Sequence, residues 1–406
     1  MRKAFILFKT RKVVLSVLFM LTFISYLQLS GSDQKNSIEV VTSIPVETTL
    51  KGDGTERASV VWVKMINEAK RTIDLAEFYL ISKQNELLEP VIEALIKASE
   101  RGVMIKFLID KKMLGNSKIL KRRLENVKNI DVSVFDWGTL TGGVLHAKYF
   151  IVDDKEAFVG SQNFDWRSLR HIHETGLRIT DPGIVNDLKK IFDADWKYNN
   201  GDRNAYAFKK GLSQTKKDAD IVLTASPVKY NPPGIGSSLE MIKKLINGAE
   251  SEITIQLLNY KTQIYKSKRE FTELYDVLKR AALRGVKIKF AVSDWNLKKP
   301  GVRSIKELAK VKGITVKVFT IPEYSKGFIP YSRVIHSKVM RVDDLISLVG
   351  TSNWGYGYFY TSRNIEIVLR SEKIAKVLGS LFKELWNSGY GCILDPENEY
   401  IVPKTH

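Results

Sequence analysis

The sequence predicts an α/β fold with two similar α/β sandwich domains that pack pseudo-symmetrically. An N-terminal transmembrane helix is expected to precede them in the chain. Three observations predict this arrangement: an internal duplication, apolar β-rich runs that alternate with helical patterns, and an uncharged apolar run near the N-terminus. A chain of 406 residues is long enough for two domains of ordinary size, each with its own core.

The duplication is visible in the expected elements. The run RTIDLAEFYL (71–80) matches SEITIQLLNY (251–260), and ASERGVMIKFLID (98–110) matches AALRGVKIKFAVSD (281–294). In each half, a helix with apolar residues three to four apart leads through a glycine turn into an apolar strand. Strands that alternate with helices of this length indicate βαβ units and mixed or mainly parallel sheets.

These patterns divide the chain into four segments. We expect a cytosolic basic flank with a signal anchor (1–40), a first domain (45–200), a linker (201–220) and a second domain (221–395). The linker is predicted because its residues are polar and basic and show no periodicity.

The anchor is predicted from residues 13–29, which are uncharged and mostly apolar and follow five basic residues. Seventeen residues are enough for a short membrane-spanning helix, and no convincing cleavage site follows. Positive charge stays on the cytosolic side, so the domains that follow would face the periplasm, lumen or exterior. A signal peptide that is removed is the alternative left open.

One pattern of polar residues occurs twice at identical spacing, although the chain has only five histidines. Each copy reads His-x-Lys, four residues, Asp, six residues, then Gly, a hydroxyl residue, any residue and Asn. The copies comprise His146, Lys148, Asp153, Ser161 and Asn163, and His336, Lys338, Asp343, Thr351 and Asn353. Such a repeat predicts a duplicated phosphate-handling site.

The residue types suit phosphodiester chemistry. A phosphodiester resists attack, so its cleavage needs a nucleophile, a proton donor for the leaving oxygen, and groups that bind the phosphoryl oxygens. One histidine can attack while the other donates a proton. The lysines and aspartates complete the predicted catalytic set, and the hydroxyl and Asn side chains can bind phosphate. Nothing in this set requires a metal or a cofactor.

A glutamate follows each copy and is a candidate to orient its histidine. Glu174 lies after the first copy and Glu366 after the second. A carboxylate that accepts from one ring nitrogen fixes the tautomer and raises the basicity of the other nitrogen. Tyr79, Asn259 and Tyr260 end predicted strands and are further candidates for substrate contact.

The two copies resemble the HxKx4Dx6G[ST]xN signature of the phospholipase D superfamily. The segments 160–176, 329–340 and 350–359 are similar to its branch of membrane-anchored lysosomal members of animals. The resemblance implies two phospholipase D-like domains and either five-prime exonuclease activity on single-stranded nucleic acid or phosphatidyl transfer. It also implies a covalent phosphohistidine on His146 and an acid and base role for His336. The single cysteine, Cys392, departs from the disulfide-rich lysosomal members.

The formal net charge of +19 favours an anionic partner but does not choose between single-stranded nucleic acid and anionic phospholipid. We therefore expect a phosphodiesterase acting on single-stranded nucleic acid, with a phospholipid-modifying enzyme as the alternative. A membrane contact through the N-terminal helix is expected, and a homodimer is an open alternative. A catalytically dead adaptor is disfavoured because every signature position is filled in both copies.

Overall fold

The computed structural model describes residues 37–208 and 219–405, and the chain from Val40 onward groups into one compact unit. The predicted anchor, residues 13–29, lies outside the described residues. Across the two described ranges, no helix combines the length and the apolar character that a membrane crossing needs.

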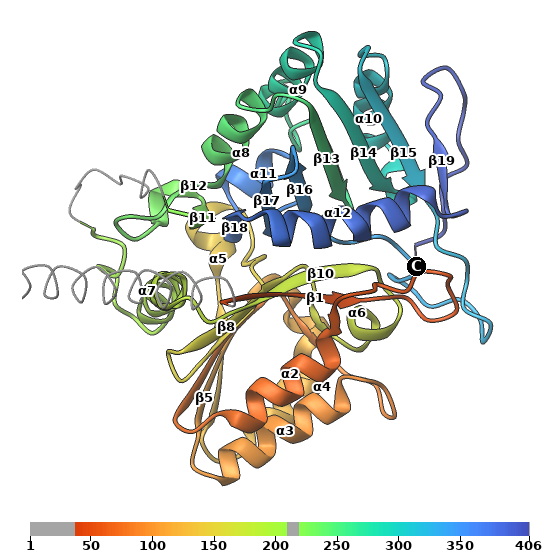
Figure 1. Ribbon diagram of the computed structural model, residues 1–406. Helices are drawn as coiled ribbons and strands as arrows, with labels where there is room; N and C mark the ends of the chain where they lie inside the picture. The colour runs from red at the N-terminus through yellow and green to blue at the C-terminus, as the bar shows by residue number, and fades with distance from the viewer. Residues whose placement is uncertain (1–36, 209–218, 406) are drawn as a thin grey trace, which may run out of the picture. The chain divides into compact units, whose positions relative to one another are not determined.

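The first lobe, coloured red to yellow-green in Figure 1, is built on an eight-stranded sheet in the order β2-β1-β10-β8-β7-β3-β5-β6. Its strands are β1 (Ile38–Ser43), β2 (Glu56–Arg57), β3 (Thr72–Glu77), β5 (Met104–Asp110), β6 (Ile130–Phe135), β7 (Tyr149–Val152), β8 (Glu156–Gly160) and β10 (Glu174–Ile179). β4 (Leu80–Ile81) and β9 (Phe164–Asp165) form a separate pair. Its helices are α2 (Ala58–Glu68), α3 (Glu89–Glu100), 3-10 helix η1 (Lys111–Met113), α4 (Leu114–Glu125), α5 (Trp137–Thr141), α6 (Trp166–Arg170) and α7 (Pro182–Asn199).

The second lobe, coloured green to blue, repeats this order as β12-β11-β18-β17-β16-β13-β14-β15 and adds β19 at the edge. Its strands are β11 (Ile221–Ser226), β12 (Gly236–Ser237), β13 (Glu252–Leu257), β14 (Lys287–Ser293), β15 (Ile314–Phe319), β16 (Val339–Val342), β17 (Ile346–Gly350), β18 (Asn364–Arg370) and β19 (Gly391–Ile393). Its helices are η2 (Val228–Tyr230), α8 (Ser238–Asn247), α9 (Glu273–Leu283), η3 (Asp294–Leu297), α10 (Gly301–Ala309), α11 (Tyr356–Tyr360) and α12 (Glu372–Asn387).

The predicted duplication is therefore confirmed at the level of topology. In both sheets the three strands that carry βαβ crossovers are parallel, and the motif strands that follow are antiparallel, so the sheets are mixed. The first sheet begins at Ile38, seven residues before the predicted boundary at 45.

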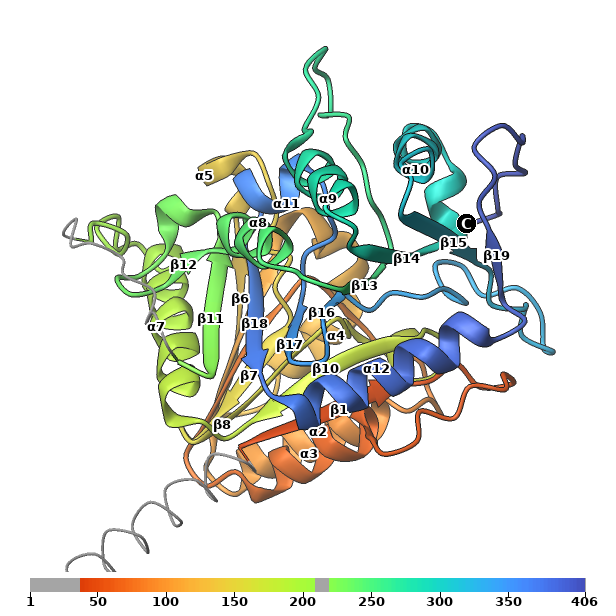
Figure 2. The ribbon, with the colours of Figure 1, turned by 45° about the horizontal axis from the view of Figure 1, so that its top comes forward.

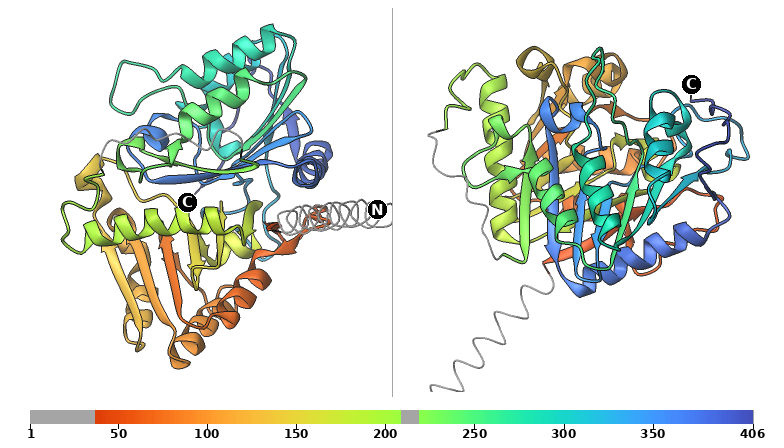
Figure 3. Two further views of the ribbon diagram at one scale, coloured as in Figure 1. Left: turned by 60° about the vertical axis from the view of Figure 1, so that its left-hand side comes forward. Right: turned by 90° about the horizontal axis from the view of Figure 1, so that it is seen from above.

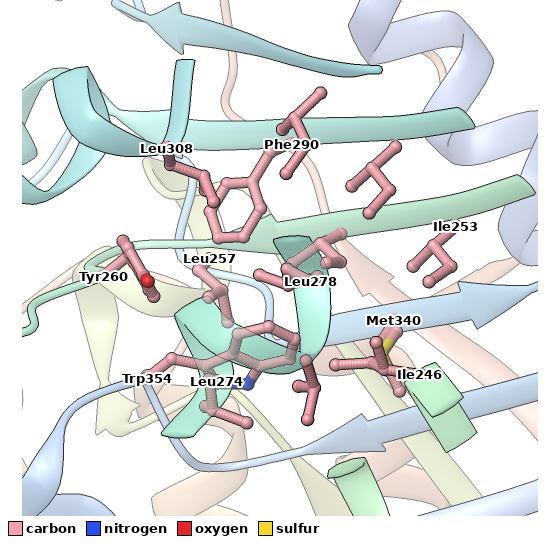
Figure 4. Close-up of a cluster of buried hydrophobic side chains, with 14 of the residues drawn as sticks. Ile246, Ile253, Leu257, Tyr260, Leu274, Leu278, Phe290, Leu308, Met340 and Trp354 are labelled. Atoms are coloured by element: carbon pink, nitrogen blue, oxygen red, sulfur yellow. The ribbon is translucent and has the colours of Figure 1, made fainter. Parts of the chain in front are cut away.

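Each sheet is covered on both faces because successive side chains of a strand point to opposite sides. In β3, Ile73 and Leu75 pack into the core formed with α2 and α3. Asp74, between them, faces the other side and pairs with Lys189 of α7 at 3.4 Å. In the second lobe, Figure 4 shows Tyr260 and Trp354 inside the cluster that β13, β14, α8 and α9 enclose.

The lobes are joined by buried polar contacts as well as by packing. Arg363, before β18, pairs with Asp195 of α7 at 2.8 Å, and both side chains are buried. α7 of the first lobe also lies against β11 of the second (Figures 2 and 3). Backbone bridges join Leu145 to Arg363 and His173 to Ile335. The two motif copies are thus fixed relative to each other at this junction.

Candidate active site

Both motif histidines line one cavity of about 400 Å³ between the lobes. His146 precedes β7 and His336 precedes β16, which are equivalent strands, and the two side chains are 7% and 8% exposed. The cavity also contains Asn163 and Asn353, the last residues of the two signatures. The structure therefore brings the two copies together, as a two-histidine phosphoryl transfer requires.

The histidines have different partners. His336 Nδ1 lies 2.8 Å from Glu174 Oε2, and Glu174 Oε1 accepts a hydrogen bond from Ser168 at 2.7 Å. His146 Nδ1 lies 2.9 Å from Asn364 Oδ1. The Asn364 amide nitrogen donates to backbone carbonyls of Tyr358 and Ser362, so its oxygen faces His146. Each imidazole therefore carries its Nδ1 proton toward an acceptor and can present Nε2 to the cavity.

The pairing of glutamates predicted from the sequence is wrong in two respects. Glu174 contacts the histidine of the other lobe, not His146. Glu366 contacts neither histidine and accepts from the backbone N–H of Ser352 at 3.2 Å. Burial raises the pKa of Glu366 to about 7.

Strand register explains the error. Gly176 pairs with Gly160 in the first lobe, whereas Glu366 pairs with Gly350 in the second. Glu366 is therefore the counterpart of Gly176, and Asn364, two residues earlier, is the counterpart of Glu174. The two positions lie on one face of the strand, but only the earlier one reaches the junction between the lobes.

The hydroxyl residues of the two signatures contact the groups that bind the histidines, Glu174 and Asn364, and they do not line the cavity. Ser161 is fully buried, and its hydroxyl accepts from the backbone N–H of Thr175 at 3.1 Å and helps to keep the pKa of Glu174 low. Thr351 donates to Asn364 Oδ1 at 3.0 Å. Their predicted contact with phosphate is thus replaced by a role in holding the groups that orient the histidines.

The two Asn residues keep their place as phosphate-binding candidates. Asn163 has a side-chain oxygen that, in the described part of the chain, forms no hydrogen bond. Asn353 Nδ2 donates to the hydroxyl of Tyr358 at 3.2 Å, and its Oδ1 accepts from the backbone of Asn259 at 3.2 Å. Tyr79 also lines the cavity, as expected, whereas Tyr260 lies in the core.

The two motif lysines are buried, and each contacts the backbone of its own histidine. Lys148 Nζ donates to the carbonyl oxygen of His146 at 2.6 Å, and Lys338 does the same to His336. Burial lowers the pKa of Lys148 to about 7, against the opposing charges of Glu77 and Glu174. Burial also holds the pKa of Lys338 well below its usual value. An arriving phosphate would stabilise both charges.

The predicted catalytic aspartates lie away from the cavity. Asp153 follows the far end of β7, and its carboxylate accepts from the backbone N–H groups of Lys70, Arg71 and Thr72 at 2.6–2.9 Å. Asp343 occupies the same position after β16, where Ser251 donates to it at 2.8 Å. A strand advances about 3.3 Å per residue, so these groups cannot reach the reacting atoms. Both aspartates instead hold the turn that precedes the central strand.

Electrostatics favour neutral imidazoles in the empty site. Burial, together with the charges of Lys148 and Lys338, holds the pKa of His146 well below 6.5. Burial lowers the pKa of His336 to about 4, although Glu174 opposes the shift. The pKa of Glu174 is lowered although burial acts to raise it, because its contacts with His336, Lys338 and Ser161 together outweigh burial. Only the His336 pair contains a carboxylate that can stabilise an imidazolium.

Aromatic residues form much of the cavity wall, and most of them were not predicted from the sequence. Phe78, Trp295, Tyr331 and Tyr358 line it, and the rings of Phe78 and Tyr358 each lie 5.1 Å from that of His146. Phe78 stands directly before Tyr79 at a strand end, which was the available signal. The others lie in loops or short helices, whose positions no periodicity predicts.

A pair of duplicated lobes that each give one histidine to a shared cavity defines a phosphate-handling enzyme. Residues 62–196 and 242–386 both match the family described as Cardiolipin synthase, PLD-like domain. Since these segments make up more than half of the chain, the protein belongs to this phospholipase D-like family.

Two relatives are similar over most of their length. Phospholipase D Z of Dictyostelium discoideum is 28% identical over 385 residues, which cover 87% of this chain and 90% of the relative. The 5'-3' exonuclease PLD3 of Xenopus laevis is 28% identical over 405 residues, covering 88% and 81%. The chain is thus a phosphodiesterase of the phospholipase D superfamily and is similar to the branch that includes the PLD3 exonuclease.

Solved structures agree on the fold. A phosphatidylserine synthase of Haemophilus influenzae aligns with a TM-score of 0.63 at 12% identity, covering 88% of this chain and 87% of that one. A polyphosphate kinase of Porphyromonas gingivalis aligns with a TM-score of 0.56 at 15% identity, covering 88% and 48%. At such identities these likenesses bear on architecture alone.

Proposed function

We propose that the protein cleaves single-stranded nucleic acid from its five-prime end by a two-step displacement through a phosphohistidine. The observation that carries this proposal is the pair of imidazoles on one cavity, each held at Nδ1 by a different acceptor. His146, held by a neutral amide, is the nucleophile. His336, held by the carboxylate of Glu174, is the acid and then the base.

In the first step, the lone pair of His146 Nε2 forms a bond to phosphorus. The bond from phosphorus to the leaving oxygen breaks, and that oxygen takes the Nε2 proton of His336. Asn163, Asn353 and the buried lysines stabilise the charge that develops on the phosphoryl oxygens. In the second step, His336 removes a proton from water, the water oxygen bonds to phosphorus, and the bond to His146 breaks.

The aromatic wall supports nucleic acid as the substrate. Bases of a single strand stack on aromatic side chains, a contact worth about 1–3 kcal/mol per base. Trp295 and Tyr331 lie at the cavity with ring centroids 6.3 Å apart, and Tyr331 is 49% exposed. The exonuclease name of one relative points in the same direction.

The second candidate is hydrolysis or transfer of a phosphatidyl group. It is favoured by the apolar, non-aromatic side chains that also line the cavity, namely Ile81, Met113, Ile172, Leu258 and Val334. These could contact the glycerol and acyl carbons of a phospholipid. An alcohol would then replace water in the second step.

A direct comparison of substrates tests the proposal. The full-length chain would be given end-labelled single-stranded DNA and phosphatidylglycerol vesicles in parallel, with and without EDTA. We expect stepwise shortening of the DNA from its five-prime end, unaffected by EDTA. His146→Ala and His336→Ala should each abolish it while circular dichroism stays unchanged. Turnover of the phospholipid alone would refute the nucleic-acid assignment and favour the second candidate.

A further inference from the structure

A second hollow, which we call the α10 groove, lies outside the catalytic cavity and has a volume of about 650 Å³. α10 and the residues flanking it form one wall, which includes Glu307, and the C-terminal segment forms the other with Glu399, Tyr400 and Val402. Figure 2 shows α10 and this segment side by side. The catalytic steps above use no residue of this groove.

The α10 wall carries a row of cations. Lys299, Arg303, Lys306 and Lys310 all line the groove. Arg303, Lys306 and Lys310 are three and four residues apart, which places them on one face of α10, and Lys299 precedes the start of the helix. The row therefore presents positive charge along a line and not over a plane.

Much of this charge is available to a ligand. Lys298 and Lys299 are exposed and form no ion pair within the described ranges. Lys306 Nζ lies 5.8 Å from the centre of the Tyr400 ring. Arg303 pairs with Glu270 at 3.2 Å, and Lys310 pairs with Glu307 at 3.3 Å. Such exposed pairs are weak, so a polyanion can compete for these two cations.

Two short stretches of chain connect the walls of the α10 groove to residues of the catalytic cavity. The α10 wall continues through Leu297 into η3, where Trp295 lines the cavity. The C-terminal wall continues to Thr405, whose carbonyl oxygen accepts from the backbone N–H of Tyr331 at 2.9 Å. Tyr331 also lines the cavity and contacts Trp295. Trp295 and Tyr331 are thus the cavity residues that these two stretches connect to the groove.

We propose that the α10 groove binds the sugar-phosphate backbone of the single strand beyond the nucleotide being cleaved. A linear row of cations beside an aromatic side chain suits a linear polyanion with bases, because backbone tracking and stacking are how proteins hold single strands. The inference rests on the proposed function and adds the path of the strand to it.

The test uses Lys299→Gln/Lys306→Gln in the full-length chain. The matched control is Lys279→Gln/Lys287→Gln, an exposed pair in the same lobe that lines neither hollow. Turnover of a dinucleotide and of a long single strand would be measured over a range of salt concentrations. Each phosphate contact adds about 0.7 to the salt slope of single-strand binding, so losing two should lower the slope by about 1.4.

We expect the groove variant to raise KM for the long strand about tenfold at low salt and to leave the dinucleotide unchanged. An unchanged KM for the long strand would overturn the groove assignment, as would an equal effect on both substrates or the same effect in the control. If the wild type cleaves strands while the groove variant behaves normally, only this inference fails. If the wild type cleaves no strand at all, the proposed function fails with it.

Discussion

Replacement of Glu174 by Gln tests the unequal roles of the two histidines most directly. The substitution keeps the shape of the side chain but removes the charge that lies 2.8 Å from His336 Nδ1. In the first step His336 must carry a proton, and its imidazolium is stabilised by this carboxylate. Glu174→Gln should therefore impair protonation of the leaving oxygen more than attack by His146.

The magnitude follows from the geometry. Opposite charges about 4 Å apart interact by roughly 4 kcal/mol at an effective dielectric constant of about 20. Each 1.4 kcal/mol corresponds to about tenfold in rate, so the variant should lose about a thousandfold in turnover of a nucleotide substrate. Ser168→Ala removes only a neutral hydrogen bond to Glu174, about 1 kcal/mol, and should cost about fivefold.

The assay compares two leaving groups under single-turnover conditions. A nucleoside alkoxide needs a proton from His336, whereas p-nitrophenolate leaves without one. We expect Glu174→Gln to retain a burst of p-nitrophenolate and to accumulate phosphoryl-enzyme on His146. A loss below tenfold on the nucleotide substrate, or a phosphoryl group found on His336, would refute the assignment of roles.

Three further predictions concern pH and the aspartates. kcat/KM should rise as the pH is lowered from 7 toward 5, because His336 must be protonated in the free enzyme and its pKa is about 4; an optimum above pH 7 would contradict this. Burial also lowers the pKa of His173 to about 4, so the unfolded chain binds more protons below pH 6.5. Stability should therefore be fully present above pH 6.5 and be lost progressively toward pH 4, as a calorimetric melting series can check. Asp153→Ala should cost about 2 kcal/mol of stability, seen in urea unfolding, yet leave turnover per folded molecule within twofold, since the carboxylate binds backbone and not substrate.

The sequence alone determined the duplication and the two histidine motifs that meet at one site. Identical spacing in two halves predicted two equivalent lobes, because side-chain periodicity and turn glycines are local properties of the chain. The same repeat predicted that His146 and His336 would share a site, and both line one cavity. Lys148 and Lys338 also lie next to their histidines, since alternate residues of an extended segment share a face.

Only the tertiary structure decided which groups complete the site. Glu174 and Asn364 reach the histidine of the opposite lobe, and no spacing within one lobe encodes a contact between lobes. Asp153 keeps a fixed distance from its histidine because it closes a turn, a role that a signature cannot distinguish from catalysis. The aromatic wall and the α10 groove likewise arise where distant segments pack together, so their positions depend on the assembled fold.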